Sequence, residues 1–201
     1  MKLFGTTTSP FVRRVAIIAA EVGEPIEWIN TAVDAGQAAL RELSPIRKIP
    51  IAIVDERSES MAGGAGRTLF DSQVIGDWLT TTRGYGELAP PRDRWRERNL
   101  VNAVDEATLS VLQLFNLRRD GIAIDGNAFA QRQLDRADAI FQWLATEVSP
   151  REFGLPQISV ICALDWMDFR STYPTERAAG LAPLRTAWRD RPSVVATRPR
   201  T

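Results

Sequence analysis

MKLFGTTTSPFVRRVAIIAAEVG (residues 1–23) combines two apolar patterns separated by a short polar segment. Residues 2–5 form a short apolar run, which predicts a buried strand. Apolar side chains then recur at helical spacing over 11–22, and Gly23 follows as a helix stop signal. Ser9 and Pro10 are the residue types that a helix favours at its N-cap and at its first position. This stretch therefore predicts a strand, a short loop and a capped helix.

Strand and helix patterns continue to alternate as far as residue 79. Further strands are predicted over 26–33, 49–54 and 67–70, and further helices over 35–43 and 71–79. This order is typical of an open α/β layer structure. In the glycine-rich segment DERSESMAGGAG (55–66), no Gly-Lys-Ser/Thr follows the glycines and no helix pattern begins there, so we interpret it as a long hairpin loop and not a phosphate-binding loop.

The character of the chain changes after the Gly/Pro-rich connector at 80–93. Long amphipathic helices are predicted over 94–119 and 127–148, a third over 157–170 and a shorter one over 181–190, with no convincing strand pattern. We therefore expect an α/β domain over 1–80, a linker over 81–92 and an all-helical domain over 93–201.

Composition excludes several kinds of function. The 25 basic residues balance the 25 acidic ones, so bulk charge recruits neither nucleic acid nor an anionic membrane. The sequence has no histidine, which excludes a Ser-His-Asp triad and a histidine metal site. Its single cysteine, Cys162, excludes an internal disulfide and a paired-cysteine zinc or redox motif, and lies in an apolar helix pattern typical of a buried thiol. With neither a signal-peptide pattern nor a run of transmembrane length, we expect a cytoplasmic protein without a metal.

Ser9 has two interpretations. As an N-cap it needs no further role. The same position, in a loop that leaves a strand and enters a helix, also places backbone N–H groups and a positive dipole end where an anion such as a thiolate is stabilised. Thr7 and Thr8 lie close enough to compete with Ser9 for such a role.

Two other stretches carry similar double interpretations. Pro50 opens the strand in SPIRKIPIAI, which suits a sheet edge, but a cis Ile49–Pro50 bond would also turn the Ile49 backbone toward a ligand. In LFDSQVIGDWL, Asp71 or Ser72 caps a helix. The same pair can receive an α-amino acid head group, because the helix N-terminus and Ser72 hold a carboxylate while Asp71 holds an ammonium.

Taken together, these stretches resemble the cytosolic glutathione S-transferases. The similarity covers TTTSPFVRRV, SPIRKIPIAI and LFDSQVIGDWL, then ALDWMDFR (163–170) and WRDRPSVVATRP (188–199), and it is strongest toward bacterial, serine-type members. The resemblance implies a thioredoxin-like α/β N-terminal domain and an all-α C-terminal domain. It also implies that glutathione is a co-substrate and that the protein is a homodimer.

The resemblance assigns roles to individual residues. Ser9, with Thr7 and Thr8 as alternatives, would activate the glutathione thiol. The Ile49 backbone before Pro50 would pair with the cysteinyl part, and Lys48 would reach the glycyl carboxylate unless it is simply solvated. Asp71 and Ser72 would hold the γ-glutamyl end. Phe11 and Trp166 are candidates for the pocket of the second substrate, and a core position is the alternative for Trp166.

One departure from the family pattern concerns the last core helix. Its usual Ser/Thr-x-x-Asp capping box is replaced by Gly154 and Gln157, which predicts a weaker but intact helix start.

The resemblance implies a detoxifying transferase that activates the glutathione thiol for attack on a small electrophile. The alternative is a non-catalytic glutathione-binding or protein-interaction module with the same fold. A thiol–disulfide enzyme is disfavoured, because serine stands at the position where such enzymes need cysteine.

Overall fold

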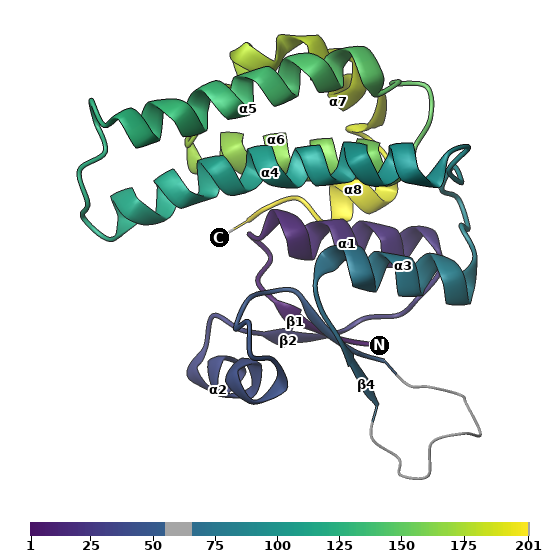
Figure 1. The fold of residues 1–201 in the computed structure, drawn as a ribbon. Coiled ribbons are helices and arrows are strands. Elements are labelled where there is room, and N and C mark those ends of the chain that lie inside the picture. Colours follow the sequence, from purple (N-terminus) through teal and green to yellow (C-terminus); the bar gives the residue numbers. More distant parts are fainter. Residues whose placement is uncertain (55–65, 201) are drawn as a thin grey trace. The chain divides into compact units, whose positions relative to one another are not determined.

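The structure is a computed structural model that describes residues 1–54 and 66–200. Its contacts divide the chain into two compact units (Figure 1). The first comprises Met1–Leu88 together with the segment that begins at Ala196, and the second comprises Ala89–Val195. The end of the chain thus returns to the N-terminal unit.

The first unit is built on a four-stranded sheet. Its strands are β1 (Lys2–Gly5), β2 (Glu27–Asn30), β3 (Ile51–Val54) and β4 (Arg67–Leu69), in the order β2-β1-β3-β4. β1 pairs parallel with β2 and antiparallel with β3, and β3 pairs antiparallel with β4. This mixed sheet, with a helix between β1 and β2, is the thioredoxin-like arrangement that the sequence predicts.

Helices cover both faces of this sheet. α1 (Pro10–Glu21) and α3 (Ser72–Arg83) lie together on one face, and α2 (Asp34–Leu43) lies on the other (Figure 1). Phe4 packs with Leu40 of α2 and with Ile51 in one apolar cluster. Successive strand side chains point to opposite faces, so Leu3 is buried on the side away from that cluster.

A glycine allows the first strand to approach α1. A Cβ atom placed on Gly5 would lie 2.5 Å from a methyl carbon of Val12. No real Cβ contact is that short, so only glycine fits where β1 leads into the loop before α1. The loop that carries Ser9 therefore joins two elements that lie in close contact.

The second unit is helical. Its elements are α4 (Arg94–Arg119), α5 (Ala128–Glu147), α6 (Leu155–Arg170), the 3-10 segment η1 (Thr175–Leu181) and α7 (Ala182–Trp188), and α8 (Pro192–Ala196) follows. α4 packs against both α5 and α6 (Figure 1). Every residue over 155–164 is buried, which makes α6 the central helix of this unit.

The start of α6 follows the predicted weaker cap. The Gly154 N–H donates to Oε1 of Gln157 at 3.1 Å, and the Gln157 side-chain amide donates to the Ser149 carbonyl at 3.0 Å. Gln157 thus bonds back to the cap residue, as in a capping box, although glycine supplies no side-chain oxygen. Cys162, further along the helix, is buried, as expected.

Most predicted elements are confirmed, with shifts at their ends. The strand expected over 26–33 is limited to Glu27–Asn30, and the helix expected over 157–170 begins at Leu155 because Pro156 suits the first turn. The short helix expected over 181–190 is confirmed as α7, which ends at Trp188, and the 3-10 segment η1 before it was not predicted. α8 was also not predicted.

Two predictions concern segments rather than elements. The hairpin loop expected over 55–66 falls outside the described residues except for Gly66. The division into domains over 1–80 and 93–201 with a linker over 81–92 stays a prediction, although α3 continues to Arg83. Among the helices that the structure describes, none is both long and apolar enough to cross a membrane.

The first unit contains a buried carboxylate, that of Glu24, which pairs with two positively charged groups. The Glu24 side chain is 4% exposed, and it accepts from the Met1 amino group at 2.8 Å and from Nε of Arg83 at 2.7 Å. Burial by itself opposes the charged form of Glu24, but the hydrogen bonds and positive charges of these two partners outweigh it and lower the pKa of Glu24.

We expect Glu24→Gln to lower the free energy of unfolding at neutral pH by about 1–3 kcal/mol, the usual cost of losing charge-assisted hydrogen bonds. Because the folded pKa is lowered below 4.5, the stabilisation is present above about pH 4.5 and is lost as the pH falls through the folded value. Urea denaturation at several pH values measures this. Glu27→Gln is the matched control, because its 3.4 Å pair with Lys2 is exposed. An equal loss in both variants would contradict the prediction.

Candidate functional site

The strand pairing brings three separate loops to one edge of the sheet. Phe4 near the end of β1 lies opposite Ile51 at the start of β3, and Leu69 at the end of β4 lies opposite Ala52. The loop after β1, the turn before β3 and the turn after β4 therefore meet at the same edge. These are the segments that hold Ser9, Pro50 and Asp71.

Ser9 is the N-cap of α1, as predicted. Its backbone is extended, and its Oγ accepts from the Val12 N–H at 3.3 Å, while Pro10 occupies the first helical position. The side chain is half-buried. Because this bond uses Oγ as an acceptor, the Ser9 hydroxyl proton can still be donated to an anion placed beyond the helix end.

The neighbouring threonines are oriented differently. The Thr7 hydroxyl donates to the Arg200 carbonyl at 3.3 Å, so its proton points toward the C-terminal segment. The Thr6 and Thr8 hydroxyl oxygens lie 3.4 Å apart and pair with each other. Of these hydroxyls, only that of Ser9 is bonded to a backbone N–H of the helix start.

The turn before β3 contains a cis peptide bond between Ile49 and Pro50, which confirms that part of the prediction. Pro50 is buried, Ile49 is half-buried and Lys48 is exposed. The contact of Lys48 with a glycyl carboxylate stays a prediction.

The structure shows which residue of the Asp71–Ser72 pair caps α3. Asp71 is the N-cap of α3, and its Oδ1 accepts from the Gln73 N–H at 2.9 Å. Asp71 is exposed, and the peptide bond that precedes it is cis. Ser72 begins the helix and is buried. The cap carboxylate thus faces solvent next to a buried hydroxyl at a helix N-terminus.

Arg14 is the residue that sequence analysis missed. Its Nη1 donates to Oγ of Ser72 at 3.2 Å, and both side chains are at most 3% exposed. This bond links α1 to the start of α3 and places a buried positive charge beside the Asp71–Ser72 pair. The signal available was the pair Arg13–Arg14, since these two charged residues stand between the buried apolar residues Val12 and Val15 of the helix.

The two candidates for a second-substrate pocket lie in different units. Phe11 is half-buried in the first unit, with the Arg14 guanidinium 5.6 Å from its ring centre. Trp166 is buried in the second unit, in an edge-to-face contact with Phe115 at 5.8 Å between ring centroids. Their joint role in one pocket stays a prediction.

The second unit has a cavity of its own, of about 290 Å³, beside the start of α4. Burial raises the pKa of Glu97, which lines it, to about 7. Arg96 pairs with Glu147 at 2.7 Å and Arg92 with Glu152 at 2.8 Å on the same lining. Across residues 1–54 and 66–200, the structure shows no cluster of three or more His, Cys, Asp or Glu side chains that could hold a metal ion.

Comparison with known proteins identifies the N-terminal domain and the fold. Residues 3–87 match the family model for the glutathione S-transferase N-terminal domain. A glutathione transferase family member from Pseudomonas fluorescens Pf-5, solved with bound glutathione, is 27% identical and superposes with a TM-score of 0.80 over 100% of this chain and 99% of that one. Residues 3–87 therefore form a glutathione S-transferase N-terminal domain, and the whole chain has the glutathione S-transferase fold.

Other relatives agree with this assignment. The uncharacterized GST-like protein YibF of Escherichia coli (strain K12) is 24% identical over 183 residues, which cover 87% of this chain and 85% of YibF. Glutathione S-transferase U6 of Arabidopsis thaliana is 30% identical over 114 residues, 55% of this chain and 47% of that protein. The predicted glutathione S-transferase fold is thereby confirmed.

Asp71 offers a way to separate the effect of helix capping on stability from the effect of charge. We expect Asp71→Ala to lower the free energy of unfolding by about 1 kcal/mol, because the α3 cap is lost. Asp71→Asn should change the free energy of unfolding by only a few tenths of a kcal/mol, because asparagine caps as well as aspartate. Urea denaturation at pH 7 compares them. Equal destabilisation by both substitutions would show that the charge, and not the cap, stabilises the fold.

Proposed function

We propose that this protein is a glutathione S-transferase family member that binds glutathione at the sheet edge formed by Ser9, Pro50 and Asp71 and transfers its sulfur to a small electrophile. The observation that carries the proposal is the meeting of two capped helix N-termini and a cis-proline turn at one edge. The Pseudomonas fluorescens relative was solved with bound glutathione, which supports glutathione as the co-substrate.

The γ-glutamyl end would bind at the start of α3. Its carboxylate would accept from the backbone N–H groups there and from Ser72, in the positive field of the helix N-terminus. The buried guanidinium of Arg14, 3.2 Å from Oγ of Ser72, adds a full positive charge to this region. The exposed carboxylate of Asp71 would hold the ammonium group. Together these groups match both charges of an α-amino acid.

The rest of the tripeptide would extend along the turn before β3. The Ile49 backbone would pair with the cysteinyl unit as an added strand does. Lys48 is exposed and would reach the glycyl carboxylate. This orientation would direct the cysteinyl sulfur toward the start of α1.

Ser9 would activate the sulfur. The nucleophile is the thiolate, and a thiol with a pKa near ~8.5 is only a few per cent ionised at neutral pH. Lowering that pKa by about two units requires ~2.7 kcal/mol of preferential stabilisation of the anion. A hydrogen bond from the Ser9 hydroxyl and the N-terminus of α1 supply interactions of this size. Ser9 positions and stabilises the anion, so no histidine base is needed.

The alternative is a glutathione-binding or protein-interaction module without turnover, because one fold can host both activities. Family likeness also supports a cytoplasmic homodimer with a detoxifying role. We include these features in the proposal on that ground alone. Conjugation of an activated aryl chloride separates the enzyme from the module, because both would bind glutathione but only the enzyme would consume it.

We expect the protein to bind glutathione in isothermal titration calorimetry, and Asp71→Asn to weaken binding about tenfold, the usual effect of losing one charge-assisted pair. Because asparagine still caps α3, the loss of affinity would be due to the missing contact between the Asp71 carboxylate and the ammonium group of glutathione. Asp34→Asn is the control, since Asp34 lies in the first turn of α2, on the other face of the sheet. If the unsubstituted protein fails to bind glutathione, both the enzyme and the binding module are wrong.

For Ser9, we expect Ser9→Ala to raise the pKa that governs kcat/KM for the aryl chloride by one to two units, toward the ~8.5 of a free thiol. Ser9→Thr should keep the lower value, because it keeps the hydroxyl. Thr8→Val should also leave the profile unchanged. A pH–rate profile measures all three variants. A shift in Thr8→Val with none in Ser9→Ala would assign the activation to Thr8 instead.

A further inference from the structure

The cavity beside the start of α4 lies entirely within the second unit. Its volume is about 290 Å³, and its lining comes from the segment before α4, the first turns of α4, the end of α5 and the start of α6. None of the residues proposed to bind glutathione lines it. The volume suits a small organic molecule of about one ring.

Two ion pairs connect the α4 side of this cavity to the end of α5 and the segment that follows α5. Arg96 pairs with Glu147 at 2.7 Å, and Arg92 pairs with Glu152 at 2.8 Å. Both arginine side chains are more than half exposed, so the pairs lie on the solvent side of the lining. The opposite charges cancel within each pair, so neither pair leaves a net charge for a ligand.

Glu97 is the third glutamate of the lining, and it differs from the other two. Its side chain is half-buried, and no described residue forms an ion pair or a hydrogen bond with its carboxylate. Burial raises the pKa of Glu97 to about 7, and no neighbouring charge or hydrogen bond opposes this effect. The cavity therefore contains a carboxylate whose ionised form lacks a counter-charge.

Asp93 supplies a further negative charge. Its Oδ1 caps α4 by accepting from the Trp95 N–H at 2.9 Å and from the Arg96 N–H at 3.1 Å. The α6 residues of the lining carry no charge, and the charged side chains are those of Arg92, Asp93, Arg96, Glu97, Glu147 and Glu152. Because four acids face two arginines when Glu97 is ionised, the cavity favours a cation.

Apolar groups make up another part of the lining. They are the side chains of Leu100 and Val148, which are buried, and the rings of Pro90, Pro91 and Pro156. The apolar body of a ligand would cover these groups while its charged end meets the unpaired carboxylate.

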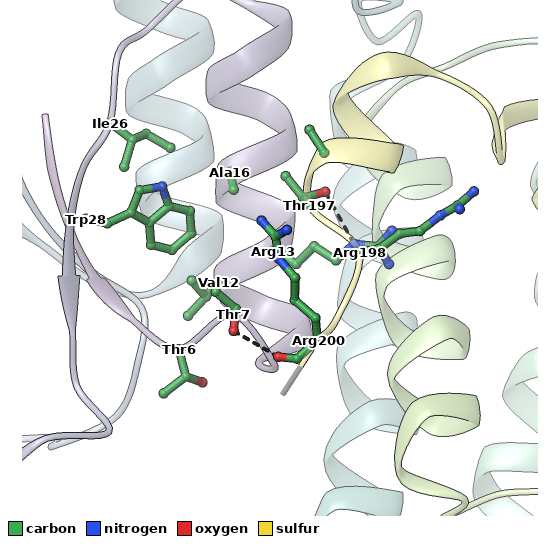
Figure 2. A pocket seen from close by; sticks show the side chains of 11 residues that line it. Thr6, Thr7, Val12, Arg13, Ala16, Ile26, Trp28, Thr197, Arg198 and Arg200 are labelled. Carbon is green, nitrogen blue, oxygen red and sulfur yellow. Dashed lines mark hydrogen bonds between the residues drawn. The ribbon is translucent and has the colours of Figure 1, made fainter.

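Glu97 also differs from the polar groups of the cavity in the first unit. There, Thr7 donates to the Arg200 carbonyl and Arg13 donates to Oγ1 of Thr197, so these groups are bonded within the protein (Figure 2). The Glu97 carboxylate has no such partner among the described residues, and a ligand would supply one.

We propose that the cavity of the second unit binds a small primary amine with an apolar body of about one ring, whose ammonium group pairs with the Glu97 carboxylate. The ammonium supplies the counter-charge that Glu97 lacks, through a charge-assisted hydrogen bond. The apolar body packs against Leu100 and the proline rings. This site does not depend on the function proposed above.

The test uses 2-phenylethylamine, with the neutral 2-phenylethanol as the uncharged analogue. We expect calorimetric titration of the full chain at about pH 8 to show the amine bound at least tenfold more tightly than the alcohol, because a charge-assisted contact contributes about that factor. The titration needs no glutathione, so its result is independent of glutathione binding. Failure to bind the amine at millimolar concentration would overturn the proposal.

The affinity for the amine should depend on pH in the direction that Glu97 sets. The Glu97 carboxyl is protonated below its pKa of about 7, so the affinity should rise about tenfold between about pH 6 and about pH 8. The amine itself stays protonated over this range, so the change would come from the protein. Equal affinities at the two pH values would contradict pairing with Glu97.

Matched variants locate the site. Glu97→Gln should abolish both the preference for the amine over the alcohol and the dependence on pH. This variant should fold, because it removes a half-buried charge that has no partner. Glu106→Gln is the control, since Glu106 is an exposed residue of the same helix that does not line the cavity, and it should bind the amine normally. Equal effects of the two substitutions would place the amine elsewhere and overturn the proposal.

Competition decides whether the site is separate from that of glutathione. Saturating S-hexylglutathione should leave the affinity for 2-phenylethylamine unchanged. Displacement of the amine by this compound would assign the binding to the glutathione site instead.

Discussion

The antiparallel pairing of β3 with both β1 and β4 is the constraint on which the candidate site depends. Because both partners run opposite to β3, the ends of β1 and β4 lie beside its start. Three loops far apart in the sequence are thereby brought to one edge, and two of them lead directly into helices. A parallel β3 would carry the Ile49–Pro50 turn to the opposite edge, away from Ser9 and Asp71.

The local parts of this site could be predicted from the sequence because their physical causes are local. Ser9 before Pro10, and Asp71 before Ser72, are residue types whose side chains satisfy free N–H groups at helix starts, and both cap as expected. Gln157 is similar, since its bond to Gly154 spans one helical turn. Resemblance to a family was needed to connect these separate helix starts with one ligand.

The parts that could not be predicted depend on contacts between distant segments. Arg14 meets Ser72 only because α1 and α3 lie on the same face of the sheet, and nothing near Arg14 in the sequence indicates this partner. The return of the C-terminal segment to Thr7 and Arg13 spans almost the whole chain. The last helices were misjudged for another reason: η1 and α8 are short, so their periodicity carries little information.

In the function proposed for this chain, helix capping and ligand binding use the same atoms, which would limit how the chain can vary. A helix start that binds an anion must also be stable when no anion is bound. Its cap residue therefore has to bond to the free N–H groups without blocking the approach of the anion. Ser9 meets both needs, because its oxygen accepts from Val12 while its proton stays available. Asp71 meets them differently, since one oxygen caps α3 and the exposed carboxylate keeps a second oxygen for a cation. If the proposed roles hold, substitution by alanine at either position would therefore combine an effect on stability with an effect on function. Replacements that keep the cap, asparagine for Asp71 and threonine for Ser9, separate the two.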